Sequence, residues 1–298
     1  MSEAGLRGTL VSGIGSFYTV LTPEGARYTV RAKKKFRHRK LTPLVGDEVI
    51  FLPGEGEEDG WLEDILDRKT VCIRPPVANI SLLMLVLCPE PAPDLMLMDR
   101  LMVQARRQGM KLCMLVTKSD LDATLAEKLQ REYAQSDMPV IPVSVKTGEG
   151  LEEVRRAMRG ETACLAGQSG AGKSTLLNTL FSLSLETGDI SEKIRRGKNT
   201  TRKAELFSVE DGQIRVLDTA GFSLLEMEDV MDPAQLRLYY PEFAPYEGTC
   251  RFAECLHDRE PGCAVQSAVE AGNLSEARVA RYRQLLGEVR EVWRDRYD

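Results

Sequence analysis

The stretch with the clearest chemistry is 167–175, which reads GQSGAGKST and lies between two short apolar runs, 162–166 and 176–180. A strand before it and a helix after it are therefore expected. Its glycines let successive backbone N–H groups curl around phosphate oxygens, while Lys173 would reach the β- and γ-phosphates and the Ser174 hydroxyl would bind Mg²⁺. The alternative is a Gly-rich structural turn. The predicted phosphate-binding residues are Gly167, Gln168, Ser169, Gly170, Ala171, Gly172, Lys173, Ser174 and Thr175.

Two motifs upstream of this stretch could recognise a base. Thr117-Lys-Ser-Asp120 fits the guanine-specificity pattern Asn/Thr-Lys-x-Asp, and Ser144-Val-Lys146 resembles its companion motif. The carboxylate of Asp120 can accept from the ring N–H and the amine of guanine, whereas adenine would leave buried polar groups unpaired. The alternative is a pair of plain turns at strand ends. The predicted guanine-binding residues are Thr117, Lys118, Ser119, Asp120, Ser144, Val145 and Lys146.

Two motifs downstream could respond to the γ-phosphate. The basic stretch 195–202 supplies Thr200 and Thr201, and Asp218-Thr-Ala-Gly221 follows an apolar run. In this arrangement the aspartate holds magnesium through water and the glycine N–H contacts the γ-phosphate. The predicted magnesium ligands are Ser174, Thr200, Thr201 and Asp218. In ordinary GTPases the phosphate loop comes first and the two base motifs come last. Here both base motifs precede the phosphate loop, so the order predicts a circularly permuted nucleotide-binding domain.

A second set of residues has the spacing of metal ligands. Cys250, Cys255, His257 and Cys263 supply three thiolates and one imidazole within fourteen residues. This is a complete tetrahedral zinc set with no position left open for water, so a structural zinc site is expected rather than a catalytic one. The alternative is a loop with unligated thiols. The segment has little apolar content of its own, and zinc would stabilise it directly.

The elements that must position these motifs alternate along residues 71–225. Apolar runs at 80–87, 111–116 and 140–143 read as strands, and 95–107 and 124–135 have helical spacing. Regular alternation predicts a doubly wound α/β domain, in which ligands collect at the carboxyl ends of the strands. Both base motifs follow such strands.

Residues 1–70 instead contain five short β-rich pieces separated by turns, which predicts a small β-barrel of the OB-fold type, a common nucleic-acid platform. The stretch 31–40 between the third and fourth pieces has seven cationic residues and no acidic one. It predicts a contact with RNA phosphates, against the alternative of a solvated loop. The predicted RNA-binding residues are Lys33, Lys34, Lys35, Arg37, Arg39 and Lys40.

The totals fit a multidomain protein. The chain has 298 residues, 29% of them charged, and a net charge of −5, so any nucleic-acid surface must be local. No signal peptide and no run of transmembrane length is found, so we expect a cytoplasmic protein with no membrane partner, whose seven cysteines are thiols or metal ligands. Residues 226–298 would form a zinc-binding C-terminal domain ending in a helix over 274–297, which would pack across the zinc module and offer a basic face.

With these motifs in this order, the chain resembles the RsgA/YjeQ family of circularly permuted GTPases over nearly its whole length. The resemblance implies a monomeric GTPase that binds the small ribosomal subunit and its rRNA and assists late maturation. Its cofactors would be GTP/GDP, Mg²⁺ and one structural Zn²⁺. Phe222 stands where many GTPases have a water-orienting glutamine, and Asn199 stands where the family commonly has histidine. The residues expected in catalysis are Lys173, Asn199, Thr200 and Thr201, with Asn199 orienting water.

Two other functions remain open from the sequence. One is an RNA-binding scaffold whose GTP is structural and slowly hydrolysed. The other is an ATP-dependent kinase using the same phosphate loop, which Asp120 and Ser144-Val-Lys146 oppose.

Overall fold

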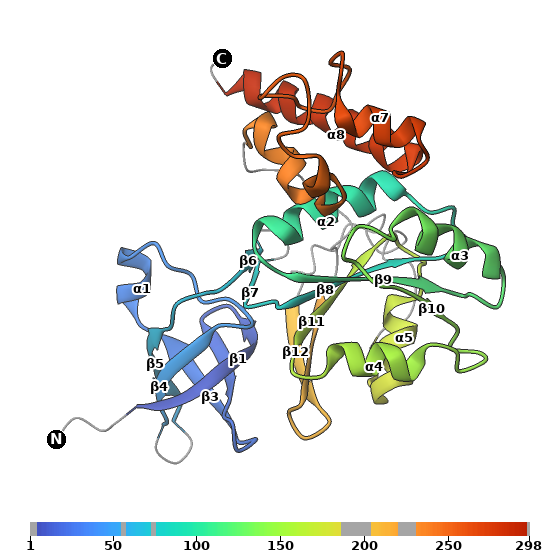
Figure 1. Cartoon of the computed structure of the whole chain (residues 1–298). Coiled ribbons are helices and arrows are strands. Elements are labelled where there is room, and N and C mark those ends of the chain that lie inside the picture. Colours follow the sequence, from blue (N-terminus) through green and yellow to red (C-terminus); the bar gives the residue numbers. More distant parts are fainter. Residues whose placement is uncertain (1–4, 55–57, 73–75, 186–203, 220–230, 297–298) are drawn as a thin grey trace, which may run out of the picture.

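The computed structural model describes residues 5–54, 58–72, 76–185, 204–219 and 231–296, apart from the side chains of Arg37 and Thr219. Figure 1 shows three parts: a barrel at the N-terminus, a central sheet flanked by helices, and a helical C-terminal module above the sheet. The predicted fold class is thereby confirmed. The domain boundaries at residues 70 and 225 stay predictions.

The N-terminal part is a closed five-stranded barrel. Its strand order is β1-β2-β3-β5-β4, and β4 pairs back to β1. The strands are β1 (Leu6–Ile14), β2 (Phe17–Leu21), β3 (Arg27–Ala32), β4 (Glu48–Leu52) and β5 (Gly60–Ile65). Alternate residues such as Val20, Val30 and Leu62 point inward and are fully buried in a core of the barrel's own. This arrangement fits the expected OB-fold.

The basic stretch between β3 and β4 is partly helical. It forms the five-residue helix α1 (Lys34–His38), whose Phe36 is buried in the barrel core. This single apolar side chain anchors an otherwise charged segment against the barrel.

The central part is a six-stranded sheet with the order β10-β9-β8-β11-β13-β12. All neighbouring pairs are parallel except β12 with β13. Its strands are β8 (Leu82–Leu87), β9 (Lys111–Thr117), β10 (Val140–Val143), β11 (Thr162–Gly167), β12 (Ala204–Val209) and β13 (Ile214–Thr219).

Helices cover both faces of this sheet because its strands are apolar on both sides. Leu83, Leu85 and Leu87 pack with α2 (Leu95–Arg107) and α3 (Ala123–Glu132) in the larger core. Met84 and Val86 face the other way, toward α4 (Leu151–Met158) and α5 (Lys173–Phe181). The first helix pair lies above the sheet in Figure 1 and the second below it.

The barrel joins the central sheet at one edge. Ser12 of β1 pairs with Glu205 of β12, and Arg215 of β13 lies 3.0 Å from Glu48 of β4. The connecting chain forms the short strands β6 (Val71–Cys72) and β7 (Val77–Ala78). The two sheets are therefore continuous through a single pair of strands.

The described residues of the C-terminal module form four helical elements. These are the 3₁₀ segments η1 (Pro233–Tyr239) and η2 (Pro241–Tyr246) and the helices α7 (Ala264–Glu270) and α8 (Glu276–Asp295). The rings of Tyr240 and Phe243 stack, the Tyr282 ring packs edge to face against both, and all three belong to the same core as α2. The module is thus packed onto the central domain by a shared core.

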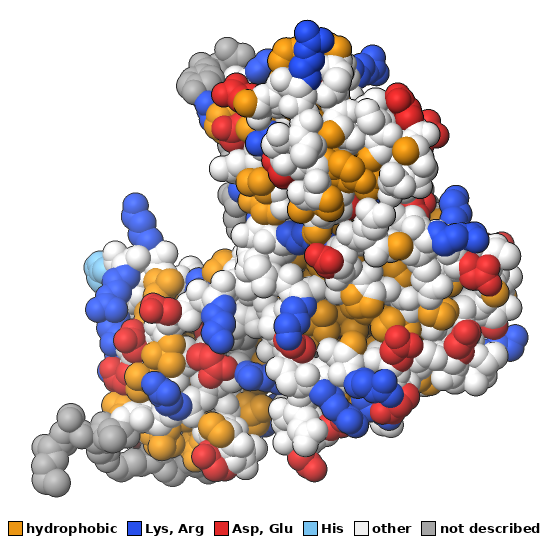
Figure 2. Space-filling view, viewed as in Figure 1, with side chains coloured by type: hydrophobic (Ala, Val, Ile, Leu, Met, Phe, Trp, Pro, Cys, Tyr) orange, Lys and Arg blue, Asp and Glu red, His pale blue; other side chains and the backbone are white. Residues whose placement is uncertain are grey.

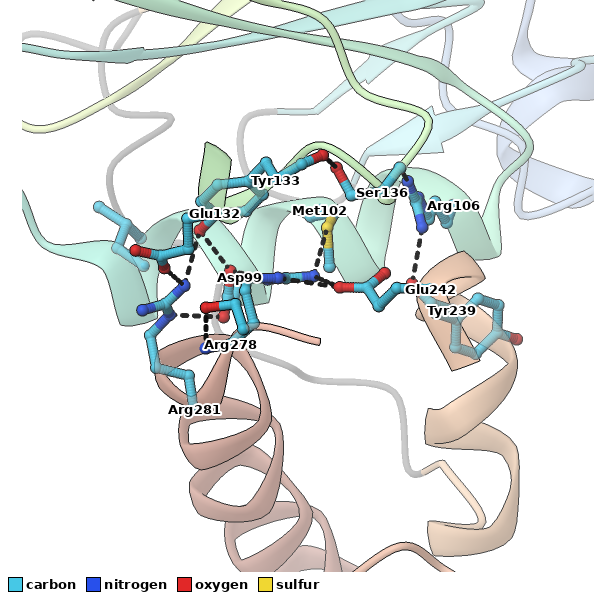
Figure 3. Close-up of polar contacts among 12 residues, drawn as sticks. Asp99, Met102, Arg106, Glu132, Tyr133, Ser136, Tyr239, Glu242, Arg278 and Arg281 are labelled. Carbon is cyan, nitrogen blue, oxygen red and sulfur yellow. Dashed lines mark hydrogen bonds and ion pairs between the residues drawn. The ribbon is translucent and has the colours of Figure 1, made fainter. Parts of the chain in front are cut away.

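A buried ionic cluster crosses the same interface (Figure 3). Arg278 of α8 is 2% exposed and donates to Asp99 of α2 and, at 2.6 and 2.9 Å, to Glu242 of η2. Arg281 donates to Asp99 at 2.9 Å and also pairs with Glu132 of α3. Burial alone would lower the pKa of Arg278, but the neighbouring carboxylates raise it overall. Two arginines of the expected basic face are therefore used inside the molecule.

Among the described residues, no helix combines the length and the apolar character needed to cross a membrane. All seven cysteines are free of disulfides, as expected, and Cys72, Cys88, Cys113 and Cys164 are buried.

Candidate functional site: a nucleotide site and a Cys3His cluster

The phosphate loop has the backbone that its glycines predict. Gly167 (φ +146°) ends β11 so close to β8 that a Cβ would lie 2.0 Å from the Val86 carbonyl oxygen. Gly172 (φ +85°) caps α5, which begins at Lys173. The helix thus begins three residues before the apolar run at 176–180. The side chains of its first turn face the phosphate loop rather than the core, so they are not apolar. Its free N–H groups and positive dipole end face the loop, where an anion would bind.

Lys173 lies inside the loop. Its Nζ donates to the carbonyl oxygens of Gly167 (2.8 Å) and Gln168 (2.6 Å), and burial lowers its pKa. Ser174 follows in the first turn of α5. An ammonium group and a hydroxyl group are thereby held next to the backbone that would surround phosphates.

Thr117 connects the first base motif to the phosphate loop. This residue ends β9, is 4% exposed, and its hydroxyl donates to the carbonyl oxygen of Ala171 at 2.6 Å. The parallel pairing of β9, β8 and β11 brings their carboxyl ends to one edge of the sheet. Residues 54 positions apart in sequence therefore meet in one site.

The second base motif orients the carboxylate of the first. The Ser144 hydroxyl donates to Oδ1 of Asp120 at 2.7 Å, and Lys146 lies 3.8 Å from Oδ2. Ser119 is held by Glu149 at 2.6 Å, while the Val145 side chain is 40% exposed. A fixed carboxylate with one oxygen directed by a donor is suited to accept from a base with two adjacent N–H groups.

A loop missed by the sequence analysis forms a wall of this site. Lys118 donates to the Glu90 carbonyl oxygen (2.7 Å), and the Gln168 amide donates to Ala92 O (3.0 Å) and accepts from Asp94 N (2.8 Å). Asp94 also caps α2 by accepting from the Leu97 N–H. Both nucleotide-binding motifs therefore contact the loop 90–94 that leads into α2. The only signal in the sequence is the Pro-rich stretch 89–93, which does not reveal a contact.

Asp218 lies on β13, which runs parallel to β11 and so points toward the same edge of the sheet as the phosphate loop. Ser169, Gly170 and Thr175 lie in the loop and at the start of α5 as expected. The remaining predicted residues fall outside the described part of the chain: Asn199, Thr200, Thr201 and Gly221.

The four predicted zinc ligands come together in the C-terminal module. The ligand atoms of Cys250, Cys255, His257 and Cys263 all lie within 4.8 Å of one another. His257 Nδ1 is 3.6 Å from Cys250 Sγ and 3.5 Å from Cys263 Sγ. Tetrahedral coordination with ordinary zinc bond lengths would put a ligating nitrogen and sulfur about 3.5 Å apart. The cluster therefore has the size and donor set of a zinc site.

The surroundings of this cluster favour a neutral imidazole. Burial lowers the pKa of His257 and raises the pKa of the Cys255 thiol to about 12. The Cys250 sulfur also accepts from the Ala264 N–H at 3.2 Å, and α8 holds the loop through Tyr282, whose hydroxyl donates to Leu256 O at 2.6 Å. Backbone and helix contacts thus orient the four ligand side chains independently of any metal.

The predicted RNA-binding segment is less positive than its sequence suggests. Lys33 and Lys35 pair with Glu63, and Arg39 lies 3.8 Å from Asp64, both acids being on β5. Lys34 and Lys40 form no ion pair with another described residue, and the Arg37 side chain is outside the described part. Pairing across strands, which local sequence does not show, reduces the free charge.

Two family models match the chain. That of the RsgA GTPase matches residues 65–228, and that of the RsgA N-terminal domain matches residues 7–62. Together they cover the barrel and the central domain.

Similar proteins span nearly the whole chain. The small ribosomal subunit biogenesis GTPase RsgA 2 of Listeria innocua is 41% identical, covering 96% of this chain and 98% of its own. The small ribosomal subunit biogenesis GTPase RsgA of Ruminiclostridium cellulolyticum is 38% identical, covering 96% and 94%.

Two solved structures are similar to this one. YjeQ from Thermotoga maritima has a TM-score of 0.82 and 33% identity, covering 95% of this chain and 98% of its own. YloQ, described as a circularly permuted GTPase, has a TM-score of 0.78 and 29% identity, covering 97% and 96%. The motif order, the family models and these relatives agree, and the chain belongs to the RsgA GTPase family.

Proposed function

We propose that this protein is a GTPase that hydrolyses GTP to GDP and phosphate on the small ribosomal subunit and assists its late maturation. The observation that carries the proposal is the contact between the Thr117 hydroxyl and Ala171 O, which unites a guanine-type motif with a phosphate loop. Relatives named as small-subunit biogenesis GTPases supply the target.

Guanine would be recognised by Asp120. Its carboxylate would accept from the ring N–H and the exocyclic amine, with Ser144 holding Oδ1. The aliphatic part of Lys118 would lie over the base, and the backbone of 144–146 would contact the guanine carbonyl oxygen. Unpaired polar groups would penalise adenine.

The phosphates would be bound by the backbone N–H groups of the loop 167–175, with Lys173 at the β- and γ-phosphates. Ser174 and Asp218 offer the hydroxyl and carboxylate oxygens that Mg²⁺ prefers, and both belong to the same edge of the sheet. Bound magnesium would neutralise charge on the β- and γ-oxygens. Thr200, Thr201 and Gly221 would complete this shell.

Hydrolysis would proceed by in-line attack of water on the γ-phosphate, with Lys173 stabilising the charge of the transition state. Phe222 cannot orient water by hydrogen bonding. We assign that role to Asn199, whose amide can orient water but cannot accept its proton, so unstimulated turnover would be slow.

Zinc would occupy the Cys3His cluster as a structural ion, because three thiolates and a neutral imidazole leave no open position. The basic segment, chiefly Lys34 and Lys40 with Lys33, Lys35, Arg37 and Arg39 around them, would contact rRNA phosphates. The protein would act as a cytoplasmic monomer.

The deciding experiment is GTP hydrolysis measured with and without purified small subunits. Strong stimulation supports the proposal. Equal, very slow release of phosphate in both cases would instead support an RNA-binding scaffold with a structural GTP.

Base specificity has its own test in Asp120→Asn. The asparagine amide presents a donor where guanine needs an acceptor but xanthine offers an oxygen. GTP affinity should fall about a hundredfold or more while XTP affinity rises. Asp122→Asn is the matched control, since Asp122 caps α3 through Thr124. Unchanged GTP binding by Asp120→Asn would refute the assignment.

A further inference from the structure

The two base motifs are joined by a residue that belongs to neither. Glu149 lies three residues after Lys146, and its Oε2 accepts a hydrogen bond of 2.6 Å from the Ser119 hydroxyl. Its backbone carbonyl oxygen accepts at 3.1 Å from the Ser144 N–H. Ser119 is part of the first base motif and Ser144 is part of the second, so Glu149 contacts both.

An acidic side chain on this surface is ordinary in itself. Figure 2 shows acidic and basic side chains scattered over the central domain, and exposed charges of this kind are usually just solvated. The contact made by Glu149 differs because Ser119 is only 4% exposed. A hydroxyl group removed from water needs a hydrogen-bond partner, and Glu149 reaches it from the surface.

The backbone around Glu149 is fixed against β10. The Gly148 N–H donates to the Ser144 carbonyl oxygen at 2.9 Å and closes a turn just before Glu149. Gly150 comes directly after it with φ +71°, and a Cβ there would lie 2.0 Å from the Pro142 carbonyl oxygen. The chain is therefore held on both sides of Glu149, and its side chain reaches Ser119 from a fixed position.

The first base motif depends on such support. Lys118, directly before Ser119, has φ +54°, in the left-handed region where a residue with a Cβ is strained. Strained backbone persists only when the contacts around it hold it in place. Ser119 supplies two of these contacts, because its N–H donates to Val143 O at 3.1 Å and its hydroxyl donates to Glu149. Asp120 follows at once, so the same contacts determine where its carboxylate lies.

The carboxylate of Asp120 must be fixed in rotation as well as in position. To accept from the ring N–H and the exocyclic amine together, it needs both oxygens in the plane of the base. Ser144 directs one of them, Oδ1, from the second motif. Glu149 acts on both sides of this contact, because it holds Ser119 next to Asp120 and accepts from the Ser144 N–H.

We propose that Glu149 is a positioning residue for guanine recognition, which ties the two base motifs together and sharpens the preference for a base with two adjacent N–H donors. The inference rests on the guanine site at Asp120 that the proposed function includes. It adds a determinant of specificity that lies outside both motifs.

Nucleotide affinities of Glu149→Ala test this role. Loss of the hydrogen bond should weaken GTP binding about tenfold. Inosine triphosphate (ITP) lacks the exocyclic amine and needs only one carboxylate oxygen, so its affinity should fall only about twofold. The ratio of the two affinities should therefore fall about fivefold, whereas a general loosening of the domain would lower both alike. Competition with a fluorescent GDP analogue measures both affinities on the full chain.

Three more variants isolate the contact. Glu149→Gln keeps a side-chain carbonyl oxygen that can accept from Ser119, so it should retain most of the GTP affinity. Ser119→Ala should match Glu149→Ala, and the double variant should lose little more, because the two side chains share one hydrogen bond. Glu153→Ala is the matched control, since Glu153 is an exposed carboxylate in the first turn of α4 and should leave both affinities unchanged. Circular dichroism checks that each variant is folded.

Two results would overturn the inference: a ratio of GTP to ITP affinity in Glu149→Ala equal to that of the unmodified protein, or additive losses in the double variant. The preference of the unmodified protein for GTP over ATP separates this inference from the proposed function. If that preference is present and Glu149→Ala behaves like Glu153→Ala, the inference alone fails. If the preference is absent, the guanine site fails and the inference fails with it.

Discussion

The barrel and the C-terminal module are joined to the central domain in different ways. At the barrel, Ser12 pairs with Glu205, Val45 forms a bridge with Val77, and the ion pair Glu48–Arg215 is 43% and 41% exposed. Among the described barrel residues, the buried side chains that belong to the main core are Val11 and Val45. The C-terminal module contributes more than a dozen buried side chains to that core and adds the Arg278 cluster.

This difference indicates different mechanical roles. A joint with few buried side chains resists reorientation less than a large shared core, so the barrel can adjust its angle at lower cost. A buried core with enclosed charges resists separation, because pulling it apart would leave charges unpaired. The C-terminal module therefore behaves as an extension of the central domain, and the barrel as an appended domain.

The largest expected effect comes from the Cys3His cluster. Cys263→Ser should abolish stoichiometric zinc, and with it a binding energy on the order of 10 kcal/mol that stabilises the module. Metal analysis and limited proteolysis within residues 250–263 measure the outcome. Cys113→Ala, a buried thiol outside the cluster, should retain one zinc per chain. If the serine variant kept its zinc, the cluster would not be the metal site.

Arg278→Met tests the buried joint itself. It removes the partner of Glu242 and one partner of Asp99, so the free energy of unfolding should fall by about 3–5 kcal/mol. Chemical denaturation gives the value. Arg290 lies on the same helix as Arg278 and forms a more exposed ion pair with Asp258. Arg290→Ala breaks that pair and should lower the free energy of unfolding by less than about 1 kcal/mol. Equal effects of the two variants would remove the distinction between buried and exposed contacts.

Arg215→Ala tests the barrel joint. Loss of an exposed ion pair should change the free energy of unfolding by less than about 1 kcal/mol, while hydrogen exchange at the β1–β12 contact should become faster. Should Arg215→Ala prove as damaging as Arg278→Met, the barrel would be as firmly attached as the module.

The smallest effect concerns the basic segment. The hydrogen bond from Lys33 lowers the pKa of Glu63, with a further contribution from Lys35. A lowered folded-state pKa means that the stabilisation is present above about pH 4.5 and is lost as pH falls below it. Glu63→Gln should therefore reduce stability by about 0.5 kcal/mol at pH 7 and by almost nothing near pH 3. A constant difference across this range would show that the carboxylate is not responsible.

Sequence reasoning predicted the parts of the site that depend on local pattern. Residue types at fixed spacings along the chain identify the phosphate loop, Thr117 to Asp120 and the cysteine–histidine cluster. The residues that form each of these sites could therefore be inferred. The alternation of apolar runs likewise predicted a parallel sheet with its ligands at one edge.

Contacts between distant, individually ordinary residues could not be predicted. Asp99, Glu242 and Arg278 look like solvated charges in sequence, and only packing makes them a buried cluster. Glu63 lies thirty residues from Lys33, so the basic segment looked freer than it is. Gln168 was expected at the phosphates, yet its side-chain amide turns toward Ala92 and Asp94.

The contact of Gln168 with Ala92 and Asp94 couples α2 mechanically to the phosphate loop. The helix is held at its first residues by Gln168 and Asp94, is bound along its length to α8 through Asp99, and ends where Arg106 donates to Tyr239 O at 3.0 Å. Thirteen residues of α-helix form a rod of about 20 Å. A tilt of a few degrees imposed at the phosphate loop would displace the far end, and the zinc module with it, by about an ångström.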